Sequence, residues 1–292
     1  MGQRRTLHNA RLLITGASQG IGHSLAERAA ARGGRVLAAA RSLALLQQLQ
    51  TAVRARGQVL EIVQADVTRP EDRQRMLDAA VDHFGGLDFL VNNAGVGASG
   101  PFADCSAERL RTIMEVNFFG LTEITRLFIP LLKQGTRPAI VNVSSVLGKR
   151  AVPGMSEYCA SKFAVQGFSE ALRAELAKDG IDVLVVNPGL TQTNFSQNMI
   201  ERKALVQLDH LRGMTAEDVA RHTLQAIAKG KNEVVLTLQG KLIALVNRFL
   251  PWVADIIVKR KIRSLFKEEM AARQGRRATK EEMQVSGARG GE

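Results

Sequence analysis

Segments typical of buried strands alternate with segments typical of helices along most of this chain. Short runs rich in Val, Ile, Leu and Ala are followed by longer runs whose apolar residues recur with helical spacing. A chain that returns through a helix after each strand lays its strands side by side and parallel. The pattern therefore predicts an α/β fold with a doubly wound sheet of seven parallel strands and helices on both faces. The expected strands cover residues 11–15, 35–40, 59–65, 87–91, 138–145, 181–186 and 233–238.

A glycine-rich turn, residues 15–22 (TGASQGIG), joins the first expected strand to the first expected helix. Glycines let a ligand approach the backbone closely, and the free amide groups at a helix N-terminus bind an anion. A turn of this kind after the first strand indicates a dinucleotide phosphate site, with a merely flexible turn as the alternative. The residues assigned to this site are Gly16, Ser18, Gln19, Gly20, Ile21 and Gly22.

Arg41 comes directly after the second expected strand, residues 35–40. An acidic residue at this place usually holds a free ribose hydroxyl, whereas an arginine suits a ribose 2′-phosphate. Arg41 therefore favours NADP(H) over NAD(H). The alternative is a solvated arginine at a strand end.

The ends of the third and fourth expected strands supply further candidate cofactor contacts. Asp66 either accepts a hydrogen bond from an adenine amino group or caps the helix that begins at Pro70. The small residues after the fourth strand form a turn and would let an adenosine ribose lie against bare backbone. The cofactor-binding residues expected here are Asp66, Val67, Asn93, Ala94 and Gly95.

Three side chains near the fifth strand have the chemistry of a carbonyl-reducing site. Tyr158, the one tyrosine among 292 residues, stands four positions before Lys162 in a helical segment, residues 156–178, so both share a helix face. An ammonium close to a phenol lowers the phenol pKa, which makes a tuned proton donor. Ser145 lies at the carboxyl end of the fifth strand, where α/β sheets bind ligands, and its hydroxyl would hold the carbonyl oxygen.

Asn117 lies inside an otherwise apolar helical segment, residues 107–132. A buried amide must be hydrogen-bonded, so Asn117 either cross-links backbone in the core or holds a water near the site. The residues alone favour the first role.

Residues 190–213 follow the sixth strand and are rich in apolar side chains. A segment beyond the carboxyl end of that strand would lie over the site and could act as a lid. Its apolar content indicates a lipophilic substrate, and packing on the core is an equally weighted alternative.

With these motifs assembled, residues 8–238 resemble the classical short-chain dehydrogenase/reductase (SDR) family. The glycine-rich turn resembles its cofactor fingerprint, and residues 92–95 (NNAG) resemble its fourth-strand motif. The tetrad of the family is matched by Asn117, Ser145, Tyr158 and Lys162, and its nicotinamide border by Pro188, Gly189, Thr191 and Thr193. Gln19 departs from the pattern, since many NADP-preferring relatives carry a basic residue there.

The resemblance implies a Rossmann-like fold, an NADP(H) cofactor and hydride transfer to a carbonyl carbon. It implies that Ser145 orients the oxygen, that Tyr158 protonates it, and that Lys162 lowers the tyrosine pKa and binds the nicotinamide ribose. It also implies that Asn117 holds a water between Lys162 and solvent, and that Arg41 is a 2′-phosphate ligand.

Composition limits the setting of the protein. With 45% hydrophobic residues, the chain suits one large domain, residues 1–238, and it contains no apolar run long enough to span a membrane. The first apolar run is too early and too short for a signal peptide, and the two cysteines have no disulfide or metal-ligand pattern. These features predict a protein of a reducing compartment, the cytoplasm, without a metal.

The C-terminal extension carries half of the net charge of +12, because Lys and Arg exceed Asp and Glu by 6 from Lys241 onward. Residues 239–273 are expected to form two amphipathic basic helices separated near Pro251, and residues 274–292 to be disordered. A tryptophan-bearing apolar face with adjoining cations fits an anionic membrane surface. The alternatives are packing against a partner subunit or against the same domain. The apolar positions are Phe249, Trp252, Val253, Ile256 and Ile257.

These features together predict an NADPH-dependent reductase of a lipophilic ketone or aldehyde. The alternatives are an NAD(P)-dependent secondary alcohol dehydrogenase and a non-catalytic cofactor-binding protein that engages membranes or partners. Neither a recognition motif nor an aromatic platform supports nucleic-acid binding. A homodimer or homotetramer is expected, and a peripheral membrane location is possible through the extension.

Overall fold

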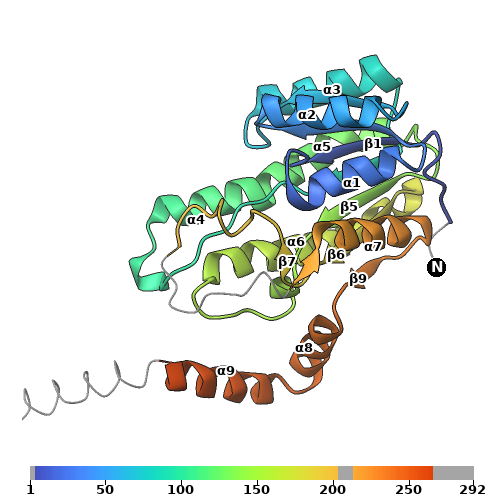
Figure 1. Cartoon of the computed structure of the whole chain (residues 1–292). Coiled ribbons are helices and arrows are strands. Elements are labelled where there is room, and N and C mark those ends of the chain that lie inside the picture. Colours follow the sequence, from blue (N-terminus) through green and yellow to red (C-terminus); the bar gives the residue numbers. More distant parts are fainter. Residues whose placement is uncertain (1–3, 203–212, 266–292) are drawn as a thin grey trace, which may run out of the picture. The chain divides into compact units, whose positions relative to one another are not determined.

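Seven parallel strands form the central sheet in the order β3-β2-β1-β4-β5-β6-β9, which confirms the predicted doubly wound topology (Figure 1). The computed structural model describes residues 4–202 and 213–265. The strand order reverses between β1 and β4, and ligands of such sheets bind at the carboxyl ends of strands around this point. The strands are β1 (Arg11–Thr15), β2 (Arg35–Ala40), β3 (Leu60–Gln64), β4 (Phe89–Asn92), β5 (Ala139–Val143), β6 (Asp182–Asn187) and β9 (Glu233–Val235).

Helices cover both faces of the sheet, as predicted. On one face, Leu25 and Leu224 belong to one buried apolar cluster with the strands, and on the other, Met76 and Phe128 belong to a second. The first face carries α1 (Gly20–Ala30), α2 (Leu43–Arg54) and α7 (Ala216–Ala228). The second carries α3 (Pro70–Phe84), α5 (Gly120–Leu132) and α6 (Ser156–Glu175).

The seventh strand is shorter than predicted. β9 ends at Val235, whereas the sequence pattern extends it to residue 238. The hydroxyl of Thr237 accepts a hydrogen bond from the amide of Gly240 at 3.0 Å, so the chain turns here into α8 (Leu238–Phe249). A threonine in this position is a helix-start signal that a reading based on apolar content alone overlooks.

The single helix expected over residues 107–132 is divided by a π-helical turn. α4 (Ala107–Met114) is followed by a turn over Glu115–Phe119 and then by α5. Turns of this kind occur often at functional sites. This one contains Asn117, whose side chain is held across to another segment.

A second, small sheet of two parallel strands was not predicted. β7 (Thr191–Gln192) pairs with β8 (Met214–Thr215), so the two ends of the expected lid lie side by side. The expected lid covers residues 190–213, and its middle part, 203–212, lies outside the described residues.

The chain divides into two compact units, residues 1–244 and 245–292. The two expected C-terminal helices are present as α8 and α9 (Pro251–Leu265), with Pro251 at the start of the second. The boundaries at residues 238 and 273 stay predictions, and the expected disordered stretch 274–292 lies outside the described residues. No helix in the described ranges has the length and apolar content that a membrane span requires.

Candidate active site

The glycine-rich turn packs too closely against its neighbours for any side chain at its glycines. Gly16 and Gly20 have φ angles of 65° and 57°, which glycine adopts without strain. A Cβ on Gly22 would lie 2.3 Å from the carbonyl oxygen of Gly16 and 2.4 Å from Nδ2 of the Asn93 side chain. No side chain caps the N-terminus of α1, where Gln19 is the exposed N-cap residue, and no acidic residue occupies its first turn. The free amide groups there can hold a phosphate.

The fourth-strand motif is tied to the end of β1. The hydroxyl of Thr15 accepts hydrogen bonds from the backbone amides of Asn93 at 3.0 Å and Ala94 at 3.1 Å. The side-chain amide of Asn93 donates to the carbonyl of Thr15 at 2.9 Å and to that of Gly16 at 3.2 Å. Two motifs 70 or more residues apart in sequence therefore meet at one edge of the sheet.

Arg41 and Asp66 lie at the ends of β2 and β3, as predicted. Arg41 is exposed, and its backbone carbonyl accepts a hydrogen bond from the side-chain amide of Gln64 at 3.0 Å. The carboxylate of Asp66 accepts from the amide of Thr68 at 2.9 Å and from its hydroxyl at 2.8 Å, forming a local turn. Of the two alternatives for Asp66, capping of the following helix is wrong, because the N-cap residue of α3 is Arg69. Val67 is buried beside Asp66.

Ser145 and Tyr158 come together from β5 and α6. Both are 8% exposed. The hydroxyl of Ser145 accepts a hydrogen bond from the amide of Leu147 at 3.1 Å, which fixes its position directly after β5. Burial raises the pKa of the Tyr158 phenol above its ordinary value, and a hydrogen bond with Ser145 opposes this only in part.

Lys162 lies one helical turn after Tyr158 and is 4% exposed. Its Nζ donates a hydrogen bond to the carbonyl of Val143 at 3.0 Å and lies 5.7 Å from the centroid of the Tyr158 ring. Burial lowers the pKa of the ammonium to about 8. The lysine is thus near the phenol but bonded to the end of β5.

The expectation of an unusually acidic phenol is wrong for this arrangement. Burial disfavours the charged form of both groups, so the pKa of Tyr158 rises and that of Lys162 falls. The phenol is therefore protonated at neutral pH, the form in which it can donate a proton.

Asn117 is 1% exposed and joins three segments. Its Oδ1 accepts from the amide of Val96 at 2.8 Å, and its Nδ2 donates to the carbonyl of Val96 at 2.9 Å and to the hydroxyl of Ser161 at 3.0 Å. A Cβ added at Gly95 would lie 3.3 Å from Asn117 Oδ1 and 3.6 Å from Lys162 Nζ, so these groups meet at Gly95. The side chain therefore has the cross-linking role that the residues alone favoured, and the water-holding role stays a prediction.

The segment after β6 continues around the same site. The carbonyl of Pro188 accepts from the amide of Val146 at 2.9 Å, and the hydroxyl of Thr191 donates to the carbonyl of Gly189 at 3.1 Å. Thr193 packs against the glycine-rich turn, since a Cβ on Gly20 would lie 3.1 Å from its methyl group.

An apolar wall lies beside Tyr158. The rings of Tyr158 and Phe195 are 5.6 Å apart between centroids, which brings the predicted lid segment against the predicted proton donor. Buried Met155, Tyr158 and Cys159 form a small cluster with four partly buried apolar residues, Leu147, Val152, Phe195 and Met199.

Sequence reasoning missed three parts of this site. Leu147 and Val152 stand between Ser145 and Tyr158 in the chain, and their apolar character in a short loop was an available signal. Ser161, which holds Asn117, was indicated only by its spacing of three residues from Tyr158.

Comparisons with known proteins agree with this fold. Residues 10–204 match the family model of the short chain dehydrogenases. Dehydrogenase/reductase SDR family member 7B of Mus musculus is 32% identical over 239 residues, which cover 79% of this chain and 74% of that protein.

Two solved structures share the fold. A short chain dehydrogenase/reductase from Burkholderia phymatum in complex with NAD has a TM-score of 0.77 and 27% identity, covering 87% of this chain and 96% of that one. The 3-ketoacyl-(acyl-carrier-protein) reductase from Brucella melitensis complexed with NADH has a TM-score of 0.71 and 27% identity, covering 79% of this chain and 97% of that one.

Proposed function

The chain belongs to the short-chain dehydrogenase family, and from this premise we propose that it is an NADPH-dependent oxidoreductase that reduces a lipophilic ketone or aldehyde. The observation that carries the proposal is the pair of buried hydroxyls, Ser145 and Tyr158, beside Lys162 and under an apolar wall. One hydroxyl can hold a carbonyl oxygen while the other protonates it.

The residues around the glycine-rich turn fit a nicotinamide dinucleotide. A Cβ at Gly16 or Gly22 would lie within 3 Å of other atoms of the protein, so only glycine lets this turn pack against residues 93–94. The uncapped N-terminus of α1 supplies donors for phosphate oxygens, and Asn93, Ala94 and Gly95 supply a flat backbone for a ribose. When bound, the cofactor supplies the hydride that adds to the carbonyl carbon.

The other steps belong to the side chains of this chain. Ser145 donates a hydrogen bond to the substrate oxygen and orients it. As the carbon gains the hydride, the oxygen gains the proton from the Tyr158 hydroxyl, and the product is an alcohol. Lys162 is held by its hydrogen bond to the carbonyl of Val143 at the end of β5. Its ammonium would stabilise the negative charge that develops on Tyr158 as the phenol gives up its proton.

The Tyr158 hydroxyl is protonated at neutral pH, which is the form that carbonyl reduction uses. Oxidation of an alcohol would require the same phenol to lose its proton first, and its burial disfavours the charged form.

The apolar wall supports a lipophilic substrate. Phe195 and Met199 come from the segment after β6, and Leu147 and Val152 come from the loop after β5. Such side chains bury a hydrocarbon group more readily than a charged one. One similar protein is a 3-ketoacyl-(acyl-carrier-protein) reductase, which acts on an acyl chain by its name.

The preference for NADPH rests on Arg41. It is exposed at the end of β2, where an arginine can pair with a 2′-phosphate. The two similar structures described above hold NAD and NADH, so the preference for NADPH depends on Arg41 alone.

Cofactor consumption measured over carbonyls of graded chain length and bulk tests the function and the cofactor together. We expect NADPH oxidation that strengthens with chain length. Arg41→Ala should raise the KM for NADPH by a factor of about 10–100, the value of a hydrogen bond to a charged group, and leave the KM for NADH unchanged. Arg32→Ala, which removes an exposed arginine after α1, is the matched control. NADPH kinetics that do not respond to Arg41→Ala would refute the cofactor assignment.

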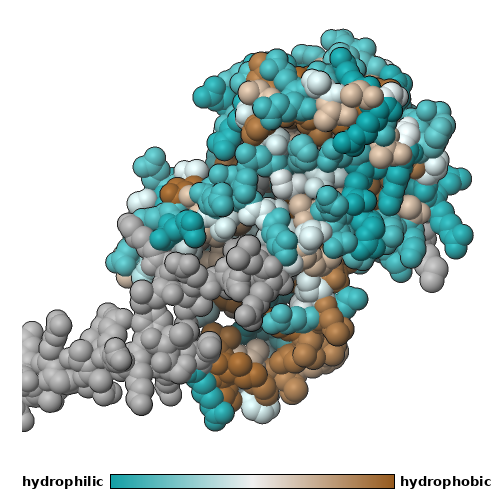
Figure 2. Space-filling view, in the orientation of Figure 1, coloured by the Kyte–Doolittle hydropathy of each residue, from teal (hydrophilic) through white to brown (hydrophobic). Residues whose placement is uncertain are grey.

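We also propose that the C-terminal helices bind an anionic membrane surface. Apolar side chains recur along α8 at helical spacing and are exposed, and Figure 2 shows hydrophobic residues gathered over this helix. The stripe consists of Leu238, Leu242, Leu245 and Phe249, which are 83%, 60%, 56% and 67% exposed.

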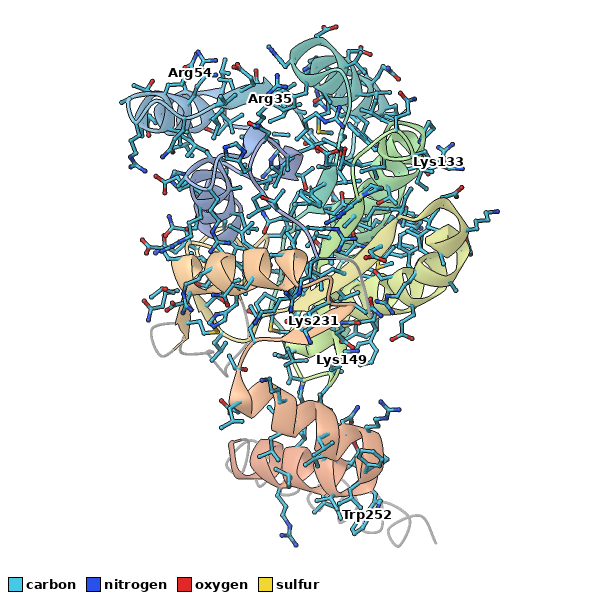
Figure 3. All side chains as sticks on the ribbon, turned by 90° about the vertical axis from the view of Figure 1, so that its right-hand side faces the viewer. Arg35, Arg54, Lys133, Lys149, Lys231 and Trp252 are labelled. Atoms are coloured by element: carbon cyan, nitrogen blue, oxygen red, sulfur yellow. The ribbon has the colours of Figure 1, made fainter. Side chains whose placement is uncertain are left out.

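α9 has the same character. Trp252, labelled in Figure 3, is 62% exposed in its first turn, and Ile257 is 58% exposed. Lys259 and Arg260 follow and are exposed as well. Apolar and cationic groups together suit the headgroup region of an anionic bilayer. We also propose that the chain self-associates as a homodimer or homotetramer.

Flotation of the whole chain with vesicles tests the membrane proposal. We expect the protein to float with vesicles containing phosphatidylserine and not with neutral ones. The double substitution Leu245→Glu with Trp252→Glu should abolish flotation, because burying carboxylates in the interface is costly. Val81→Glu changes an apolar residue on α3 that is 47% exposed and should not abolish flotation. Flotation that survives the double substitution, or a dimer that the double substitution dissociates, would overturn the proposal in favour of another surface or a subunit interface.

A further inference from the structure

A buried arginine with two carboxylate partners lies beside the site and has no part in the proposed chemistry. Arg109 on α4 is 3% exposed. Its guanidinium donates to Glu157, with Nε to Oε1 at 2.9 Å, and it also forms an ion pair with Glu201. Glu157 directly precedes Tyr158, and Glu201 belongs to the segment after β6.

Glu157 stays ionised in this cluster although it is buried. Glu157 is 2% exposed, and burial alone would raise the pKa of its carboxyl. Hydrogen bonds from Cys105 and Arg109 outweigh that effect and hold the pKa below its ordinary value. The planar guanidinium can serve both carboxylates at once, which a lysine ammonium does less well.

Residues 193–202 reach across the site from one end to the other. At the start of this segment Thr193 packs on Gly20, and farther along the side chain of Asn198 donates to that of Gln19 at 3.0 Å. In between, Phe195 contacts the ring of Tyr158.

At its far end the segment is bonded to the loop after β4. The amide of Ile200 donates to the carbonyl of Gly97 at 2.9 Å, and the amide of Ser99 donates to the carbonyl of Glu201 at 2.9 Å. The pair with Arg109 adds a side-chain anchor at this same end.

We propose that Arg109 is a positioning residue that, held by Glu157, anchors Glu201 and so keeps residues 193–202 against Tyr158, which limits the bulk of the carbonyl substrate. This inference rests on the proposed reductase function. A buried ion pair is weak evidence for stability on its own, because desolvation offsets the attraction of its charges. Arg109 connects α4 to α6, which carries Tyr158, and to the segment that carries Phe195. This connection indicates that Arg109 positions the segment beside Tyr158.

Glu201→Gln is the decisive variant, because it removes one charge of the cluster and leaves the buried pair of Arg109 and Glu157 in place. Amide hydrogen exchange in residues 194–202 should become about tenfold faster, as expected for the loss of a charge-assisted hydrogen bond. The KM for small carbonyls should rise about tenfold, since the loosened wall holds them poorly, while kcat and the KM for NADPH change less than about twofold. Bulky carbonyls should instead have a lower KM than with the wild type, because the loosened wall no longer limits their size.

Two further variants keep the result interpretable. Glu123→Gln removes the carboxylate of a surface pair in which Arg126 is 77% exposed, and it should change neither exchange nor kinetics. Arg109→Lys retains the charge and should give values between those of the wild type and Glu201→Gln.

The readouts separate this proposal from the function on which it rests. Exchange is measured without substrate, so a wild-type protein that reduced no carbonyl would refute the proposed function and leave the exchange result standing. Unchanged exchange in Glu201→Gln would overturn the positioning role. Faster exchange with the same KM for every carbonyl would overturn the limit on substrate bulk.

Discussion

Tyr158→Phe should lower kcat for carbonyl reduction by a factor of about 10²–10⁴, the usual contribution of a positioned general acid. The substitution removes the hydroxyl that meets Ser145 and keeps the ring that packs on Phe195. The chain has one tyrosine, so no other phenol can take over the proton transfer. Affinity for NADPH should change less than about twofold, because the glycine-rich turn is untouched.

Steady-state kinetics with NADPH and the best carbonyl of the panel measure this effect. Thermal unfolding of the variant is the control, and a similar midpoint shows that the loss is chemical. Phe102→Leu, at a residue 62% exposed outside the site, should keep full activity. A Tyr158→Phe protein with the turnover of the wild type would remove Tyr158 from the mechanism and leave a cofactor-binding protein as the better hypothesis.

The fold was predictable because its signals are local. Each strand of a parallel sheet is buried on both faces and therefore reads as a short apolar run, as in residues 139–143 and 183–186. The glycine-rich turn was equally legible, since Gly16 and Gly20 have the positive φ angles that only glycine adopts readily. Errors at element ends came from single polar side chains, such as Thr237, that act against the apolar pattern.

The site was predictable in its residues but not in its electrostatics. Tyr158 and Lys162 were expected to share a helix face, and they do. The sign of the tyrosine pKa shift could not be read from that spacing, because it depends mainly on burial of the phenol. Contacts such as that between Tyr158 and Phe195 produce this burial, and they join segments far apart in the chain.

Contacts between distant segments explain the other omissions. Arg109 and Glu157 are 48 residues apart, and Glu201 lies a further 44 along the chain, so no periodic pattern links them. The π-helical turn likewise contains Asn117, whose side chain is hydrogen-bonded to the backbone of Val96, 21 residues away. A helical pattern in residues 107–132 cannot reveal such an irregularity, because the apolar spacing changes by a single residue.

The burial of Lys162 should make the stability of the folded protein rise between pH 8 and pH 10. Its folded pKa is about 8 and its ordinary value is 10.5, so the unfolded chain binds more protons than the folded one between these values. Stability rises with pH wherever the unfolded state binds more protons, and the whole shift corresponds to about 3 kcal/mol. Below pH 8 the folded state carries this full cost, and near pH 10.5 the cost is gone.

Tyr158 limits the window at its upper end. Its raised pKa means that the unfolded chain loses the phenolic proton first, so this group lowers stability as the pH rises above its ordinary value of 10.0. Between pH 8 and pH 10 only the lysine acts among this pair. The net change in that interval should therefore be an increase of about 2–3 kcal/mol in the free energy of unfolding that Lys162 contributes.

Urea unfolding of the wild type and of Lys162→Met at pH 7, 8, 9 and 10 isolates this contribution as the difference between the two proteins. Methionine keeps the unbranched stem and removes the ammonium, so the difference carries a constant cost for the bond lost at Val143 and a pH-dependent part due to the charge. The wild type should gain on the variant as the pH rises from 8 to 10. Lys133→Met, which removes a side chain 47% exposed and labelled in Figure 3, controls for a general change of net charge. A difference between wild type and Lys162→Met that stayed flat over this interval would mean that Lys162 keeps its ordinary pKa, and hence that water reaches its ammonium in the folded protein.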